Sequence, residues 1–171
     1  FLLDNDGILL SAALCTPDGP CPHPGLILCH GMPATPRSDN VAPSTSVDIG
    51  YPELAKLSAE SGFATLIFNF RGAGSSTGNY HPLGWTEDLA AVIDWMQTAP
   101  QVDGSRIAVL GSSMGAAIAI YVSAHREDVA ALVTYAAPAR ITRPANVPES
   151  IARHRQLGII NDNDFPPSLE A

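Results

Sequence analysis

Apolar runs alternate with helical patterns along most of the chain, and this alternation constrains the fold more than any other feature. Residues 63–70 and 107–110 are continuous apolar runs, which are typical of strands covered on both faces. Between them, apolar side chains recur at the helical spacing i, i+3, i+4, i+7: Leu89, Val92, Ile93 and Met96. We expect this helix to begin at about Thr86. Strands that alternate with helices predict the α/β class, with a mostly parallel sheet and crossover helices.

The remaining strands and loops follow from shorter apolar runs and from turn residues. Strands are predicted at residues 8–14, 25–29 and 129–136. The turn pair Asp6-Gly7 joins the first of these in a hairpin to the apolar residues at the N-terminus. Residues 34–50 are rich in Pro, Ser, Thr and Asp and have no period, so we predict a loop there.

Three further helices are predicted. The first has Pro52 in its first turn and Gly62 as its stop, and we expect its buried face to carry three residues: Leu54, Ala55 and Leu57. Residues 116–124 are nearly all apolar, which predicts a buried helix, and residues 150–157 predict a last one. With no internal repeat, residues 1–171 are expected to form a single domain.

The charge balance argues against two classes of partner. The chain has 9 basic and 17 acidic residues, a net charge of −8. Nucleic acids and anionic membrane surfaces both attract the opposite sign, so we expect neither as a partner. No apolar run approaches the ~20 residues that span a bilayer. The three cysteines (Cys15, Cys21 and Cys29) are expected to be free thiols in a cytoplasmic protein.

Cofactor and metal patterns are also missing from the sequence. The glycines at 72, 74 and 78 are spaced one residue too far apart for a dinucleotide fingerprint. We interpret this segment as a structural turn in which Arg71 is tied to a neighbouring carboxylate. The five histidines are scattered without ligand spacing, so we predict no metal and no cofactor.

Ser113 is the candidate nucleophile. It is the centre of Gly111-Ser112-Ser113-Met114-Gly115, which follows a predicted strand and opens a predicted helix. A serine presented above a sheet at such a turn needs a strained backbone, and flanking glycines remove β-carbons that would collide with the strand and helix. The helix N-terminus adds partial positive charge and N–H groups. The alternative is a plain Gly/Ser-rich turn.

The segment His30-Gly31-Met32-Pro33 ends an earlier predicted strand and supplies a second part of the candidate site. Acyl transfer develops an oxyanion, which needs two fixed N–H donors about 3 Å away. We expect the backbone amides of Met32 and Met114 to be these donors. We interpret His30 as an architectural hydrogen-bonding residue rather than a catalytic one.

These two motifs, together with Phe70-Arg71-Gly72-Ala73-Gly74-Ser75-Ser76, resemble the α/β-hydrolase superfamily. The similarity is greatest to its dienelactone-hydrolase-like and serine-peptidase-like branches, and it covers about residues 1–140. It implies the α/β-hydrolase fold and serine hydrolase chemistry, in which Ser113 attacks an ester or amide carbonyl and forms an acyl-enzyme. A serine at this position speaks against the dehalogenase and epoxide-hydrolase branches, which use aspartate.

The resemblance also implies an acid and a histidine, in that order, after the serine. Only His125 and His154 follow Ser113. His125 ends the helix that Ser113 opens, roughly 18 Å away, and His154 lies on a polar helix typical of a lid. We therefore expect both partners beyond residue 171, with the chain as the N-terminal two-thirds of a catalytic domain. Its last strands would be missing, residues 129–136 would form an open apolar edge, and the segment alone would be inactive.

The predicted function is that of a serine hydrolase, an esterase or a peptidase, acting on a small-molecule ester or a peptide. Two alternatives stay open at this point. One is a non-catalytic α/β-hydrolase-fold protein that binds a ligand after losing its triad, and the other is an acyltransferase that uses the same turn. The sequence does not decide between ester and peptide substrates, and it leaves the oligomeric state open.

Overall fold

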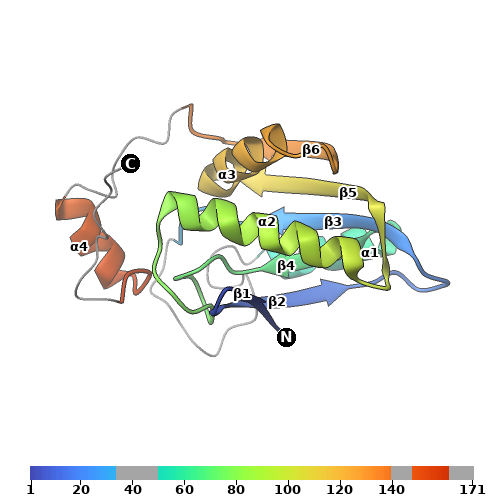
Figure 1. The fold of residues 1–171 in the computed structure, drawn as a ribbon, viewed down its shortest axis with the longest axis horizontal. Coiled ribbons are helices and arrows are strands. Elements are labelled where there is room, and N and C mark those ends of the chain that lie inside the picture. The colour runs from blue at the N-terminus through green and yellow to red at the C-terminus, as the bar shows by residue number, and fades with distance from the viewer. Residues whose placement is uncertain (34–49, 140–147, 162–171) are drawn as a thin grey trace.

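A six-stranded sheet runs through the computed structural model, which describes residues 1–33, 50–139 and 148–161 (Figure 1). The strands stand in the order β1-β2-β4-β3-β5-β6. Their bounds are β1 Leu2–Asn5, β2 Ile8–Cys15, β3 His23–Cys29, β4 Ala64–Phe68, β5 Val102–Ser112 and β6 Val129–Tyr135. The pairs β1–β2 and β2–β4 are antiparallel, and the other three pairs are parallel. The α/β class and the mostly parallel sheet are thus confirmed.

Helices cover both faces of this sheet. Their bounds are α1 Tyr51–Glu60, α2 Pro82–Thr98, α3 Ser113–Ala124 and α4 Pro148–Gln156. α2 and α3 pack together on one face, over the larger apolar core, and α1 packs on the other (Figure 1). The smaller core under α1 contains Leu28, Tyr51, Ala55 and Ile67. All five residues of β4 are buried because this strand lies between the two cores, as its apolar run predicts.

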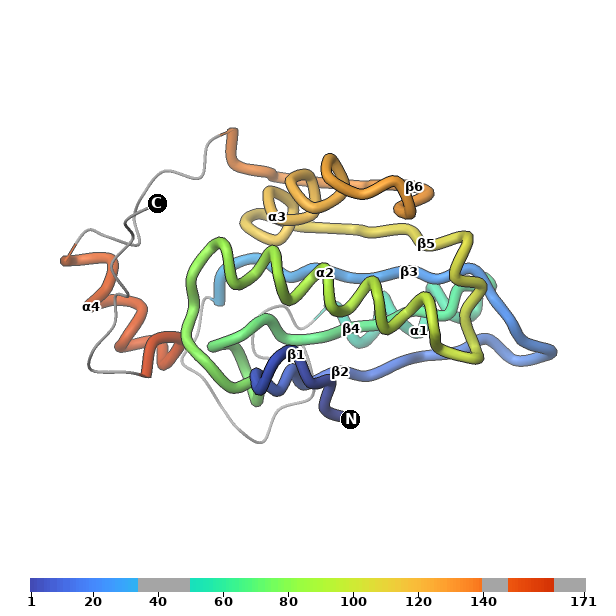
Figure 2. Tube along the Cα trace, in the orientation of Figure 1, coloured from blue at the N-terminus to red at the C-terminus, as the bar shows by residue number. Residues whose placement is uncertain are grey.

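β6 lies at one edge of the sheet and the β1–β2 hairpin lies at the other (Figure 2). Among the described residues, no strand pairs with the outer side of β6. Its side chains Leu132, Val133 and Tyr135 are 38%, 55% and 50% exposed. The expectation of an open apolar edge at residues 129–136 is therefore confirmed for the part of the chain that the structure covers.

The sequence placed several element boundaries wrongly. The helix expected from about Thr86 begins at Pro82, because proline fits the first turn and the His81 side chain accepts a hydrogen bond from the Gly84 N–H. The strand expected over residues 107–110 extends from Val102 to Ser112. The predicted loop at residues 34–50 lies, except for Gly50, outside the described residues.

Two predictions of burial are also wrong. Leu57 is 51% exposed. The buried stripe of α1 consists of residues four apart, Tyr51, Ala55 and Ala59. Leu57 lies two positions from Ala55 and from Ala59, so it is on the outward side of the helix. The helix expected at residues 116–124 begins at Ser113, and its Ile120 and Tyr121 are 44% and 48% exposed. An all-apolar helix gives no sign of which side the fold leaves uncovered.

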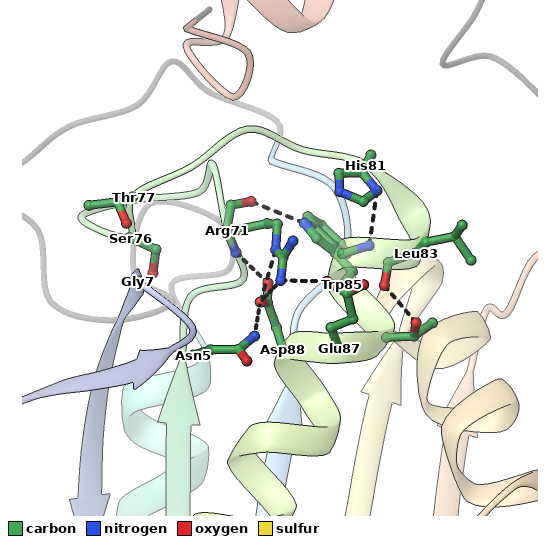
Figure 3. A network of polar contacts seen from close by, with 12 residues as sticks. Asn5, Gly7, Arg71, Ser76, Thr77, His81, Leu83, Trp85, Glu87 and Asp88 are labelled. Atoms are coloured by element: carbon green, nitrogen blue, oxygen red, sulfur yellow. Dashed lines mark hydrogen bonds and ion pairs between the residues drawn. The ribbon is translucent and has the colours of Figure 1, made fainter. Parts of the chain in front are cut away.

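A buried polar network fixes the turn between β4 and α2 (Figure 3). Asp88 is fully buried and accepts from the Arg71 backbone N–H at 2.8 Å and from Arg71 Nε at 2.9 Å. Arg71 Nη2 lies 2.8 Å from Asp88 Oδ1, and the Asn5 amide donates to the same oxygen at 3.0 Å. Arg71 also pairs with the exposed Glu87 at 2.9 Å. The predicted tie between Arg71 and a carboxylate is confirmed, and it joins the hairpin, the turn and α2.

We predict that Asp88→Asn destabilises the fold by about 3 kcal/mol, because it removes the buried carboxylate that neutralises the Arg71 guanidinium and leaves it only the exposed Glu87. Urea unfolding of the full-length gene product measures the change. Asp94→Asn is the matched control, since Asp94 lies on the same helix and pairs with Arg126 at 2.6 Å but is 63% exposed. This control should lose less than about 1 kcal/mol. Equal losses in the two variants would contradict the prediction.

We also predict that stability falls as the pH drops below about 6.5, the ordinary pKa of histidine. Burial and the Arg71 guanidinium lower the pKa of His81, so the unfolded chain binds the proton first and stability rises with pH through this window. Protonation would also remove the acceptor that caps α2 at Nδ1, 3.0 Å from the Gly84 nitrogen.

His81→Asn tests this pH dependence, because asparagine caps helices without titrating. Unfolding free energies measured from pH 5 to pH 8 should fall less steeply towards acid in this variant. The slope should be reduced rather than abolished, because burial also lowers the pKa of His154. A slope unchanged from that of the parent protein would rule out this role for His81.

Candidate active site

Ser113 stands at the sharp turn between β5 and α3. β5 ends at Ser112 and α3 begins at Ser113, whose φ of 49° lies in the left-handed region that side-chain-bearing residues rarely adopt. The side chain is exposed. The strained, exposed serine at a strand–helix junction matches the geometry that the motif predicts.

The glycines of the motif are required by close backbone contacts. A β-carbon at Gly111 would lie 2.7 Å from the Ala116 Cα. A β-carbon at Gly115 would overlap the His30 carbonyl oxygen and lie 2.6 Å from that of Cys29. The first turn of α3 therefore sits directly against the end of β3, and only glycine allows this approach.

The loop after β3 lies beside the candidate nucleophile. A β-carbon at Gly31 would come within 2.9 Å of Ser113 Cβ and 3.5 Å of Ser113 Oγ. Met32 and Met114 are both half-buried and pack against the larger core. β3 and β5 are neighbours in the sheet, and their residues Cys29 and Gly111 are paired. This pairing brings the His30-Gly31-Met32 segment after β3 next to Ser113 after β5.

His30 orients the peptide that joins Gly31 to Met32. The ring is fully buried, and its Nε2 lies 3.1 Å from the Phe70 nitrogen, which can only donate. The ring proton is therefore on Nδ1, which donates to the Gly31 carbonyl oxygen at 2.7 Å. Because the carbonyl and the N–H of a trans peptide point in opposite directions, this bond directs the Met32 N–H away from His30.

Aromatic rings hold His30 in place. Trp85 and Phe70 stack on each other at 4.3 Å, and both meet His30 edge-on, at 5.4 and 5.1 Å between ring centroids. The Trp85 indole N–H donates to the Arg71 carbonyl oxygen, as Figure 3 shows. The polar network around Asp88 therefore connects to the candidate site through Trp85. These contacts agree with the interpretation of His30 as a hydrogen-bonding residue that supports the structure.

The two histidines that follow Ser113 do not approach it. Among the described residues, no histidine hydrogen bonds to the Ser113 hydroxyl. His125 lies at the opposite end of α3, where its Nδ1 is 2.7 Å from the Tyr121 carbonyl oxygen. His154 lies on α4 and packs edge-on against Tyr80 at 5.1 Å.

Sequence reasoning missed Tyr51 and Asp88. Tyr51 is 1% exposed, and its hydroxyl lies 2.9 Å from Ser112 Oγ. The two residues are 61 positions apart, and no motif marks the tyrosine. Asp88 stands among apolar residues of α2, and its neighbours in sequence do not reveal that it is buried.

Within residues 1–33, 50–139 and 148–161, no group of three His, Cys, Asp or Glu side chains is placed to hold a metal ion. None of the helices in the same ranges has the length and apolar character needed to cross a bilayer. The cysteines at 15, 21 and 29 are free thiols, as predicted.

Comparison with known proteins gives the family. Residues 24–158 match the family model described as alpha/beta hydrolase fold. An alpha-beta serine hydrolase homologue from Coxiella burnetii is 30% identical, with a TM-score of 0.66, over 92% of this chain and 68% of that one. XC6422 from Xanthomonas campestris, described as an a/b serine hydrolase without lid, is 26% identical, with a TM-score of 0.66, over 83% of this chain and 62% of that one.

A curated relative, an uncharacterized 31.7 kDa protein of Escherichia coli, is 31% identical over 133 residues. This match covers 76% of the chain and 42% of the relative, so the chain spans less than half of that protein's length. The family model, by contrast, covers most of the chain and includes both the His30 segment and the Ser113 turn. The chain belongs to the alpha/beta hydrolase fold family.

Proposed function

We propose that the protein is a serine hydrolase that cleaves an ester or peptide bond through an acyl-enzyme on Ser113. The observation that carries this proposal is the exposed, left-handed Ser113 with Gly31 packed against it. The family to which the chain belongs has the alpha/beta hydrolase fold. Serine chemistry is supported by the two relatives whose descriptions call them serine hydrolases.

In the proposed reaction, Ser113 gives its hydroxyl proton to a base as Oγ attacks the substrate carbonyl carbon, and the carbonyl oxygen becomes an oxyanion. The Met32 and Met114 amides donate hydrogen bonds to it. Collapse of the tetrahedral intermediate expels the alcohol or amine, which takes that proton from the base, and leaves an ester on Ser113. Water then attacks this ester and releases the acid. The His30 bond to the Gly31 carbonyl supports this assignment because it fixes the plane of the peptide that carries the Met32 N–H.

The proposal includes a histidine base and an acid among residues of the whole protein that follow Ala171. This placement agrees with the chain order of the family's triad. His125 and His154 are poor candidates for the base, because the first lies at the wrong end of α3 and the second packs on Tyr80.

We predict that Ser113→Ala lowers nitrophenyl ester hydrolysis by the full-length gene product at least about 10³-fold. A fluorophosphonate probe should label the parent protein and not the variant. Ser123→Ala is the matched control, because it deletes one hydroxyl from the same helix. Persistent labelling of Ser113→Ala would assign the nucleophile to another residue. An unlabelled parent protein would favour the non-catalytic binding alternative.

We predict that Gly31→Ala lowers kcat about 100-fold, because the new methyl group would displace Ser113 or the loop beside it. Gly25→Ala is the matched control. Gly25 lies on β3, the strand that leads to Gly31, and its β-carbon would meet the Val102 side chain at the same 2.9 Å, but away from Ser113. Thermal unfolding of both variants separates loss of fold from loss of rate. If both variants lose kcat equally, crowding of β3 rather than displacement of Ser113 is the cause.

A further inference from the structure

The hydroxyl group of Tyr51 bridges two strand ends. It lies 2.9 Å from the Cys29 carbonyl oxygen and 2.9 Å from Ser112 Oγ. Tyr51 is the first residue of α1 and is 1% exposed, so both bonds are shielded from water. Hydrogen bonds in such surroundings are stronger than they are at the surface.

The direction of each bond follows from the chemistry of the groups. A carbonyl oxygen can only accept, so Tyr51 donates its single proton to Cys29 and accepts the proton of the Ser112 hydroxyl. Burial raises the pKa of Tyr51 above its usual value, so this proton is retained at neutral pH. Ser112 occupies the N-cap position of α3 without capping the helix with its side chain. Its hydroxyl is committed to Tyr51 instead.

The two bonded residues are the last residues of their strands, immediately before the two halves of the candidate site. Cys29 ends β3 and precedes the His30-Gly31-Met32 segment, and Ser112 ends β5 and precedes Ser113. The pairing of β3 with β4 stops at Leu28, one residue before the bridged carbonyl. A single hydroxyl on α1 therefore connects the strand end that leads to the Met32 amide with the strand end that leads to the nucleophile.

We propose that Tyr51 is a positioning residue, which holds the loop of the Met32 amide and the turn of Ser113 at a fixed separation through the Cys29–Tyr51–Ser112 bridge. This proposal rests on the proposed serine hydrolase function. Tyr51 does not touch the reacting atoms in this role. It acts on the alignment of the oxyanion with its donors, which affects kcat more than substrate binding.

The test compares Tyr51→Phe, Ser112→Ala and the double variant in the full-length gene product, with a nitrophenyl ester as substrate. Each single variant should lower kcat roughly tenfold with KM unchanged. The double variant should be no slower than the single ones, because both remove the same bridge. Tyr121→Phe, which deletes an exposed tyrosine hydroxyl on α3, should retain the parent kcat. Ser112→Ala probes the bridge from its other end if Tyr51→Phe does not fold.

Parent-like kcat in both single variants, or losses that multiply in the double variant, would overturn the positioning role. That result would leave the proposed function intact if Ser113→Ala is inactive. Full activity of Ser113→Ala would overturn the proposed function, and the role of Tyr51 with it. The two failures are therefore distinguishable.

Discussion

The contact between the first turn of α3 and the end of β3 is the constraint on which the rest of the site depends. At Gly115 the helix backbone meets the carbonyl groups of Cys29 and His30 with no room for a side chain. A β-carbon at Gly31 would lie 2.9 Å from Ser113 Cβ, so the loop also packs closely against the serine. At Gly115 backbone therefore lies directly on backbone, and the main chain limits how closely the turn of Ser113 and the loop can approach each other.

Two further layers support this contact from opposite faces of the sheet. On the α2 side, His30 is enclosed by Phe70 and Trp85, and Trp85 is bonded to the turn that Arg71 and Asp88 stabilise. On the α1 side, Tyr51 satisfies the Cys29 carbonyl. The loop beside Ser113 is thus supported on the α2 side by the buried Arg71–Asp88 ion pair, through Trp85 and His30. On the α1 side it is supported by the Tyr51 hydroxyl group.

The sequence predicts the parts of this arrangement that depend on local pattern. Continuous apolar runs located β4 and the core of β5, and the glycines around Ser113 located the turn, because each signal lies within a few residues. Residues whose role comes from distant partners escaped prediction. Asp88 can be buried because Arg71 and Asn5 bind its carboxylate. These partners lie 17 and 83 positions away in the sequence, so no local pattern reveals them. The start of α2 was missed because the apolar pattern begins after the capping residue His81.

The backbone of Ser113 narrows the choice of side chains that could replace this proposed nucleophile. Its left-handed φ is tolerable for an unbranched side chain but is especially unfavourable for one branched at the β-carbon. Threonine carries a hydroxyl of the same chemistry, yet its extra methyl group would add to strain that the turn already stores. The chemistry of this position is therefore open to cysteine and closed to threonine, for reasons of conformation rather than reactivity.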